Sequence, residues 1–164
     1  MTRLISIRNS VSDSSRRLLQ NKAASLLAPQ SQIVNRKSQM ILGTGIDLIE
    51  VARIAASFAK FGDRFVNRVL LPDEIAYCLA HKNPAPFLAV RFAAKEAVSK
   101  AFGTGIGAQL GWQDIEIRRK ESGEPFVVLH GKGAELLATR GARQLHLSLT
   151  HTENYAAATA ILEG

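Results

Sequence analysis

A long helical segment that ends in glycines most constrains how this chain can fold. Its pattern begins at Pro84 and Pro86, continues to about Phe102, and stops at the glycine-rich residues 103–107. Proline suits the first turn of a helix and glycine suits the residues just after its end. The pattern is amphipathic, yet Glu96 lies among alanine and phenylalanine near its middle. A lone carboxylate in such surroundings is costly unless it is paired or bound to a metal.

A second acid, Asp47, ends the apolar run of residues 41–46, which predicts a buried strand. Each acid also has a plain alternative. Asp47 could be a helix N-cap or turn residue, and Glu96 could be an exposed residue paired with Lys100 one helical turn later. Together they suit Mg²⁺, which prefers one or two carboxylates plus water and substrate phosphates. The four histidines are scattered and show no zinc spacing.

The remaining pattern predicts an α+β domain with mostly antiparallel strands. The expected elements are helices over 50–61, 72–80 and 132–139, a connector over 65–70, a hairpin of strands 114–119 and 125–129, and final strands 144–150 and 155–162, with His151 in the loop between the last two.

The basic charge of the chain is concentrated in its first 39 residues. The net charge is +7, of which residues 1–39 supply +6 from seven basic residues and one acid; residues 40–164 hold 14 basic and 13 acidic residues, for +1. We expect residues 1–39 to be a basic, disordered extension with one amphipathic stretch over 16–27, and residues 40–164 to form the domain. The extension has the composition of an organellar transit peptide. The preferred interpretation is an upstream start codon, because Met40 directly precedes the first predicted strand.

Two further features bear on location. The longest apolar stretches are far shorter than the roughly 20 residues of a membrane-spanning helix. We therefore expect that this chain is not an integral membrane protein. Cys78 is the only cysteine, which excludes an intramolecular disulfide and suits a reducing compartment. It lies in a helical pattern and is expected to be a buried structural thiol. The expected location is cytoplasmic, or an organelle if residues 1–39 are a transit peptide.

Four motifs follow one another along the chain. They are G-I-D-L-x-x-x-x-R over 45–53, F-x-x-K-E-A-x-x-K over 92–100, F-G-T-G-I-G over 102–107 and S-L-T-H over 148–151. In this order they resemble the 4′-phosphopantetheinyl transferases, specifically the small holo-acyl-carrier-protein synthase branch. The resemblance runs from residue 40 to the C-terminus. It implies that family's α+β fold, a mostly antiparallel sheet packed on a long helix.

The resemblance also implies an activity. The enzyme would transfer the 4′-phosphopantetheine arm of coenzyme A to a serine of apo acyl carrier protein, with Mg²⁺, for fatty acid biosynthesis. Asp47 and Glu96 would be the metal ligands and would act in catalysis with Lys100, which offsets charge in the transition state. The general base stays open between a metal-bound water, Glu96 and Asp47.

Further residues are candidates for binding coenzyme A. The resemblance implies His151 near the nucleotide phosphates, with Ser148 beside it. Arg91, Lys95 and Lys100 give the long helix three cations suited to phosphate.

Two glycines after the long helix are also coenzyme A candidates. Gly103 and Gly105 would let the backbone approach a bulky ligand closely; a plain helix C-cap is the alternative.

The expected macromolecular partner is the acidic carrier protein. Arg53 matches the motif arginine and is the best single docking candidate; Lys60, Arg64 and Arg68 complete a local basic set. Complementary charge would speed the encounter more than it deepens affinity. The resemblance also implies a homotrimer with active sites shared between neighbours.

Two other functions were weighed. One is another Mg²⁺-dependent enzyme acting on a nucleotide pyrophosphate, such as a hydrolase. The other is a nucleic-acid-binding module, suggested by the basic total. We expect no nucleic-acid partner, because residues 40–164 are nearly neutral.

Overall fold

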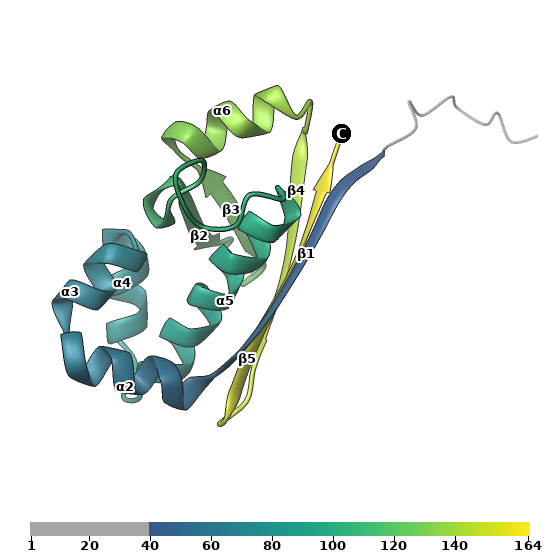
Figure 1. Ribbon diagram of the computed structural model, residues 1–164. Helices are drawn as coiled ribbons and strands as arrows, with labels where there is room; N and C mark the ends of the chain where they lie inside the picture. The colour runs from purple at the N-terminus through teal and green to yellow at the C-terminus, as the bar shows by residue number, and fades with distance from the viewer. Residues whose placement is uncertain (1–39) are drawn as a thin grey trace, which may run out of the picture. The chain divides into compact units, whose positions relative to one another are not determined.

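The structure, a computed structural model, describes residues 40–164; the predicted N-terminal extension and its amphipathic stretch lie outside the described residues. Within this range no helix combines the length and the apolar content needed to cross a membrane. The elements, in chain order (Figure 1), are β1 (Ile41–Glu50), α2 (Val51–Phe61), α3 (Asp63–Val69), α4 (Pro72–Leu79), α5 (Ala85–Ala101), the 3-10 helix η1 (Trp112–Asp114), β2 (Ile115–Arg119), β3 (Pro125–Leu129), α6 (Gly131–Thr139), β4 (Gln144–His151) and β5 (Tyr155–Glu163).

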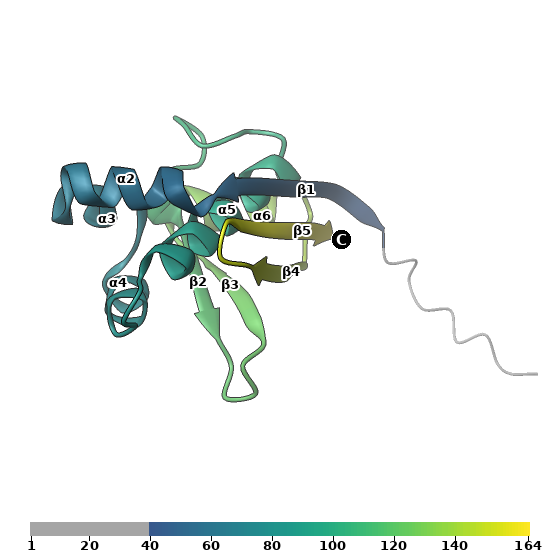
Figure 2. The ribbon, with the colours of Figure 1, turned by 90° about the horizontal axis from the view of Figure 1, so that it is seen from below.

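All strand pairs are antiparallel, and the predicted α+β class is confirmed. One sheet has the order β1–β5–β4, and β2 and β3 form a separate hairpin. Asp47 of β1 pairs with Ala158 of β5, which pairs with Leu149 of β4. Figure 1 shows the helices on one side of the larger sheet, and Figure 2 shows its three strands in order with the hairpin beyond β4. The other face of the sheet has no covering layer within residues 40–164.

Helix α5 lies against the inner face of this sheet and is the centre of the fold. It contacts all three strands of the sheet and also α2, α4 and β2. As a result 12 of its 17 residues are buried, so the predicted amphipathic pattern is wrong for this helix. Its many alanines allow the close approach, because their short side chains leave room for neighbours on several sides.

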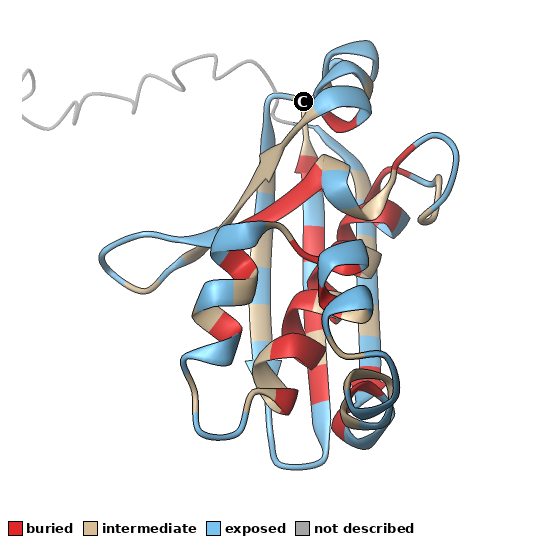
Figure 3. Ribbon diagram, turned by 90° about the vertical axis from the view of Figure 1, so that its left-hand side faces the viewer, coloured by how far each residue is buried: buried red, intermediate tan, exposed pale blue. Residues whose placement is uncertain are grey.

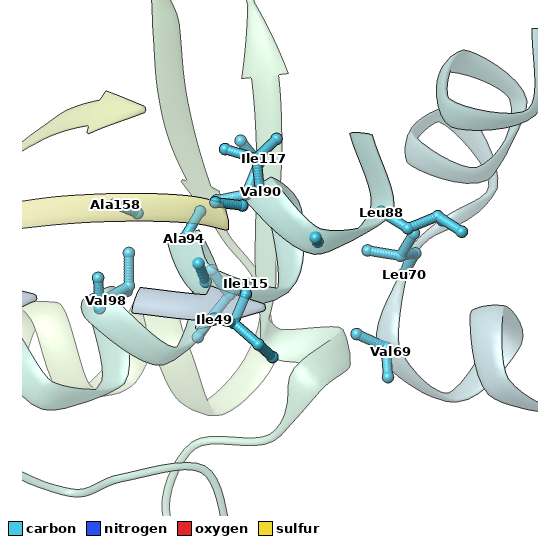
Figure 4. Packing of buried hydrophobic residues seen from close by; sticks show 14 of the residues in the cluster. Ile49, Val69, Leu70, Leu88, Val90, Ala94, Val98, Ile115, Ile117 and Ala158 are labelled. Atoms are coloured by element: carbon cyan, nitrogen blue, oxygen red, sulfur yellow. The ribbon is translucent and has the colours of Figure 1, made fainter. Parts of the chain in front are cut away.

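The hydrophobic core is built around α5. In Figure 4, Val90 of α5 lies beside Ile117 of β2, and Ala94 and Val98, further along the same helix, lie near Ala158 of β5. Figure 3 shows the same concentration of buried residues along the middle of the molecule. A helix packed in this way is rigid, so the functional side chains that it carries have fixed positions.

Several predictions of local structure differ from the structure. β1, predicted as a buried strand ending at Asp47, continues to Glu50, and Ile49 is its one buried residue. A helix, α3, occupies the segment predicted as a connector. Gly62, with a φ of 50°, separates it from α2, and this left-handed conformation favours glycine. His151 is the last residue of β4 and not part of a loop.

Candidate active site

Strand β1 and helix α5 bring Asp47 and Lys100 together. The Nζ of Lys100 donates to Oδ1 of Asp47 at 2.8 Å and to the carbonyl oxygen of Ile46 at 3.0 Å. The side chain of Asp47 is 16% exposed and that of Lys100 is 47% exposed. Lys100 therefore pairs across to the strand, and not with Glu96 on its own helix.

Glu96 lies beside this pair on α5 and is half-buried. Burial raises the pKa of Glu96, the negative charge of Asp47 raises it further, and the positive charge of Lys100 opposes both effects. Two carboxylates that repel one another in a half-buried position attract a cation. Asp47 and Glu96, 49 positions apart in the printed sequence, thus form one acidic site.

The acidic site fits a hard divalent cation that is also held by its substrate. Mg²⁺ commonly takes one or two carboxylates and completes its shell with water and phosphate oxygens. Within residues 40–164 no three His, Cys, Asp or Glu residues gather into a metal cluster. Asp47 and Glu96 are the residues that would hold such an ion.

Two glycines of β1 set the distance between the strand and α5. A Cβ on Gly45 would lie 1.9 Å from the carbonyl oxygen of Ala97, and one on Gly43 would lie 2.0 Å from that of Ala101. Any side chain here would push the strand, and Asp47 with it, away from the helix. This role was not predicted from the sequence. The available signal was the pair of glycines inside a strand, which often marks close approach of another backbone.

A pocket of about 250 Å³ opens between α5, the β2–β3 hairpin and β4, and Arg91, Ser148 and His151 all line it. Arg91 is 4% exposed, and its Nε has no hydrogen-bond partner in the described part of the chain. Its guanidinium lies 4.1 Å from the centre of the Tyr77 ring. A buried arginine with an unused donor is suited to an anionic ligand.

The aromatic rings of Phe87 and His151 line one wall of this pocket. The rings of His81 and Phe87 stack at 3.6 Å between centroids, and Phe87 lies 5.2 Å from the ring of His151. Such a wall suits a planar ligand.

The acidic site and the pocket lie on different flanks of α5. Arg91 and Glu96 are five residues apart, which is a turn of about 140° around an α-helix. Asp47 belongs to β1 at one edge of the sheet, and His151 belongs to β4 at the other. Within one chain, Arg91 and His151 therefore do not share a face with Asp47 and Glu96, whereas Lys100, the third predicted coenzyme A ligand, lies at the acidic site.

Lys95 is not available to a ligand, which contradicts its prediction as a phosphate partner. Its fully buried Nζ donates to Glu74 Oε2 at 2.7 Å, to the Val69 carbonyl at 2.8 Å and to the Trp112 carbonyl at 3.1 Å. These bonds use all three donors of the ammonium group. Burial lowers the pKa of Lys95, and the Glu74 carboxylate opposes that effect. The sequence could not show this pairing, because Glu74 belongs to another helix.

The glycines after α5 form the end of that helix. Gly103 and Gly105 have φ of 71° and 64°, and the N–H groups of Thr104 and Gly105 donate to the carbonyl oxygen of Ser99. This is the helix C-cap that the sequence analysis named as the alternative. Their contact with a ligand stays a prediction.

The predicted docking cations lie on two consecutive helices. Arg53 and Lys60 are on α2, and Arg64 and Arg68 are on α3. All four are exposed, and none forms a salt bridge with a residue of the range 40–164. We call these four residues the α2–α3 basic surface. An open hollow lined by Phe61, Phe65, Arg64 and Arg68 lies within it.

Comparisons with known proteins point to one family. A family model described as the 4′-phosphopantetheinyl transferase superfamily matches residues 43–160. The chain is 52% identical to the holo-[acyl-carrier-protein] synthase of Koribacter versatilis over 124 residues, which is 76% of this chain and 99% of that protein. It is also similar to a crystal structure of holo-[acyl-carrier-protein] synthase from Neisseria meningitidis, with a TM-score of 0.72 and 34% identity over 76% of this chain and 100% of the other. A third similarity is to the Helicobacter pylori synthase in complex with coenzyme A, with a TM-score of 0.66 and 33% identity over 73% and 98% of the two chains.

Proposed function

The chain belongs to the 4′-phosphopantetheinyl transferase superfamily, and we infer that it transfers the 4′-phosphopantetheine arm of coenzyme A to a serine of apo acyl carrier protein. Its relative in Koribacter versatilis, matched over nearly its whole length, is named a holo-[acyl-carrier-protein] synthase. The observation that carries the inference is the meeting of two family motifs at one point, where Asp47 and Lys100 bond beside Glu96.

We propose that the reaction depends on Mg²⁺ held by Asp47 and Glu96. The raised pKa of Glu96 beside Asp47 supports this, since a cation would relieve their repulsion. When bound, the ion supplies Lewis-acid neutralisation of the pyrophosphate charge.

The remaining chemistry is one of charge and position. Attack of the serine oxygen on the β-phosphate forms a new P–O bond, while the bond from the β-phosphorus to the bridging oxygen of the pyrophosphate breaks; adenosine 3′,5′-bisphosphate leaves with that oxygen, and the serine gives up its proton to a base. Such a step needs alignment and fixed positive charge more than covalent help. We propose that Lys100, held in place by Asp47 and the Ile46 carbonyl, supplies one such charge. The base that accepts the serine proton stays open between Glu96, Asp47 and a bound water.

We propose that the nucleotide end of coenzyme A binds in the pocket lined by Arg91 and His151. The buried guanidinium and its unused Nε donor support a phosphate partner there. The ring wall at Phe87 supports a planar base.

We propose a homotrimer in which neighbouring chains share active sites. The separation of the two ligand sets by about 140° around α5 supports this, because a second chain would supply the missing half. The outer face of the sheet also supports it. Ile46 and Leu48 are 65% and 64% exposed there, beside the exposed Tyr155 and Ile161, and an apolar patch of this kind commonly marks an interface.

We propose that the carrier docks on the α2–α3 basic surface, with Arg53 as the main contact. Its four cations, none of which forms a salt bridge within residues 40–164, are suited to an acidic partner. The surface follows β1 directly in the chain, since α2 begins one residue after the strand ends. A docked carrier is thereby brought toward Asp47.

The experiment that tests the function measures the intact mass of an apo acyl carrier protein after incubation with this protein, coenzyme A and Mg²⁺. The expected result is a gain equal to one phosphopantetheine arm. Parallel samples replace coenzyme A by ATP or omit Mg²⁺ with a chelator, and neither should modify the carrier. An unchanged carrier mass in the complete mixture would refute the transferase function.

A further inference from the structure

The 3-10 helix η1 connects the α2–α3 basic surface to the helix that carries Glu96. Its middle residue, Gln113, has an exposed side chain whose two amide N–H groups face three backbone carbonyls at the end of α3, so that one N–H is shared between two of them. The distances from Nε2 are 2.9 Å to Asn67, 3.3 Å to Arg68 and 3.1 Å to Leu70.

These bonds complete the hydrogen bonding at the end of α3. The last carbonyls of a helix have no donor within the helix and need one from outside. The Val66 carbonyl accepts from the Leu70 N–H at 2.8 Å, and the Val69 carbonyl accepts from Lys95 at 2.8 Å. Gln113 donates to the remaining carbonyls, those of Asn67, Arg68 and Leu70. One side chain thus supplies most of the cap.

Helix α3 is unusually dependent on this cap. It has seven residues, and Gly62 at its N-terminal end offers no side-chain cap. Isolated helices of this length are unstable in water. Val66 and Val69 hold its inner face in the core, while Arg64 and Arg68 lie exposed. The cap therefore helps to fix where these two cations stand.

The same turn is also fixed to α5. The Trp112 carbonyl accepts from Lys95 at 3.1 Å, and the Trp112 ring lies 4.7 Å from that of Phe92. Lys95 directly precedes Glu96 in the sequence. Through η1, the end of α3 and the acidic residue of α5 are held in one fixed arrangement.

From this arrangement we infer that Gln113 is a positioning residue for carrier docking. By capping α3 it holds Arg64 and Arg68 at a fixed place relative to Glu96, so that a docked carrier presents its serine to the acidic site. The inference rests on the proposed function, in which the carrier docks on the α2–α3 basic surface. Its consequence is selective, because Gln113 bonds to α3 and does not line the Arg91–His151 pocket.

Three substitutions of Gln113 separate its hydrogen-bond donors from its size. Gln113→Met keeps the length and removes the donors. Gln113→Glu places an anion against the carbonyls. Gln113→Lys restores donors at a helix end that favours cations.

The Michaelis constants for apo carrier and for coenzyme A are measured separately. We expect Gln113→Met to raise the Michaelis constant for the carrier about fivefold, the effect that the loss of one hydrogen bond commonly has, and to leave the constant for coenzyme A unchanged. Gln113→Glu should be worse and Gln113→Lys close to wild type.

A matched control removes the effect of charge. Gln109→Lys adds the same charge at an exposed glutamine of the same connection. It should not lower the Michaelis constant for the carrier in the way that Gln113→Lys does relative to Gln113→Met. Amide hydrogen exchange gives a second readout. In Gln113→Met the amides of α3 should exchange faster, while those of α5 keep wild-type rates.

Three results would overturn the inference: equal rises in both constants, an unchanged carrier constant in Gln113→Met, or a Gln113→Lys variant no better than Gln113→Met. A wild-type protein that leaves the carrier unmodified would instead refute the proposed function, and the exchange measurement would still test the cap.

Discussion

Single side chains of this protein have environments that define their chemistry. Asp47, Glu96 and Lys100 meet where β1 crosses α5, and only one of the two carboxylates is bonded to the lysine. Lys95, next to Glu96, is instead buried, and its ammonium group donates all of its hydrogen bonds to groups in the protein interior. Neighbouring charges on one helix thus serve different purposes, because one side chain points to the half-open site and the other into the core.

Replacing Asp47 or Glu96 with Ala should abolish transfer and leave the fold intact, because these residues hold an ion and do not fill the core. We expect kcat to fall by about 100-fold or more, since losing even an outer partner of a metal ligand costs 10–100-fold. The melting temperature without metal should stay close to wild type. Glu135→Ala, at an exposed glutamate of α6, is the matched control. Normal turnover of Glu96→Ala at ordinary Mg²⁺ would contradict the assignment.

Cys78 should be unreactive in the folded protein. It is 0% exposed, and burial raises the pKa of its thiol from 9.0 to about 11. The folded pKa lies above the unfolded one, so the stability gained from the neutral thiol is present below pH 9 and is lost as the pH rises toward 11. At pH 8 we expect alkylation at least about 100-fold slower than in denaturant, followed by intact mass. Equal rates in the two conditions would show that the thiol is accessible.

At the scale of elements, the contact between β1 and α5 decides the site. The two elements come from distant parts of the sequence, and two strand glycines let their backbones touch. Helices α2 and α3 then continue from β1 and carry the basic surface. The positions of β1, α5 and the α2–α3 basic surface therefore depend on one another.

Gly45→Ala should destabilise the fold and impair the site together. Its Cβ would lie 1.9 Å from the Ala97 carbonyl oxygen, and overpacking of this kind costs about 1–3 kcal/mol. Thermal or urea unfolding measures the loss. Gly107→Ala is the control, because within residues 40–164 no atom beyond its two chain neighbours lies within 4 Å of the added Cβ. If both variants unfold alike, the close contact does not hold the strand in place.

Arg53→Glu on α2 should weaken carrier docking and spare the nucleotide site. We expect the Michaelis constant for the carrier to rise by about tenfold, with a weaker salt dependence than wild type, because an attractive exposed charge becomes a repulsive one. The constant for coenzyme A should stay nearly unchanged. Arg143→Glu makes the same change of charge at an exposed residue of the loop before β4. If only the Michaelis constant for coenzyme A shifted, Arg53 would be assigned to the nucleotide site and not to carrier docking.

At the scale of the whole molecule, residues 40–164 carry all four motifs and the whole of the described core. Their near-neutral charge contrasts with the +6 of residues 1–39. We propose a cytoplasmic location, for which the single reduced and buried Cys78 is the supporting feature. Imaging of the full chain and of a chain starting at Met40 would test it, and organellar targeting of the full chain alone would favour a transit peptide.

A chain that starts at Met40 should fold, assemble and transfer phosphopantetheine as well as the full chain. The two proteins are compared by light scattering and by carrier mass at moderate salt. Any advantage of the full chain should disappear as salt rises, because it would come from non-specific attraction of the +6 segment. Loss of activity or of solubility in the shorter chain would show that residues 1–39 contribute to the domain.

The sequence by itself determined most of the local elements, though not α3, and it was the source of the prediction that Asp47 and Glu96 form an acidic pair. Pro84, Pro86 and the glycines after Phe102 marked the ends of α5, because these residues restrict the backbone wherever they occur. Asp47 and Glu96 were recognised through their motifs, and their meeting agrees with that prediction. These signals are local in the chain or belong to the family pattern.

Only the tertiary structure decided what each charge does. Lys95 was predicted to bind phosphate, yet Glu74, Val69 and Trp112 from other elements surround it. Gly45 carried no evident role until α5 lay against it. The separation of Arg91 from Glu96 around the helix likewise became meaningful once β1 and β4 occupied opposite edges of the sheet. The physical reason is that burial and pairing depend on contacts between residues far apart in sequence, which no local pattern specifies.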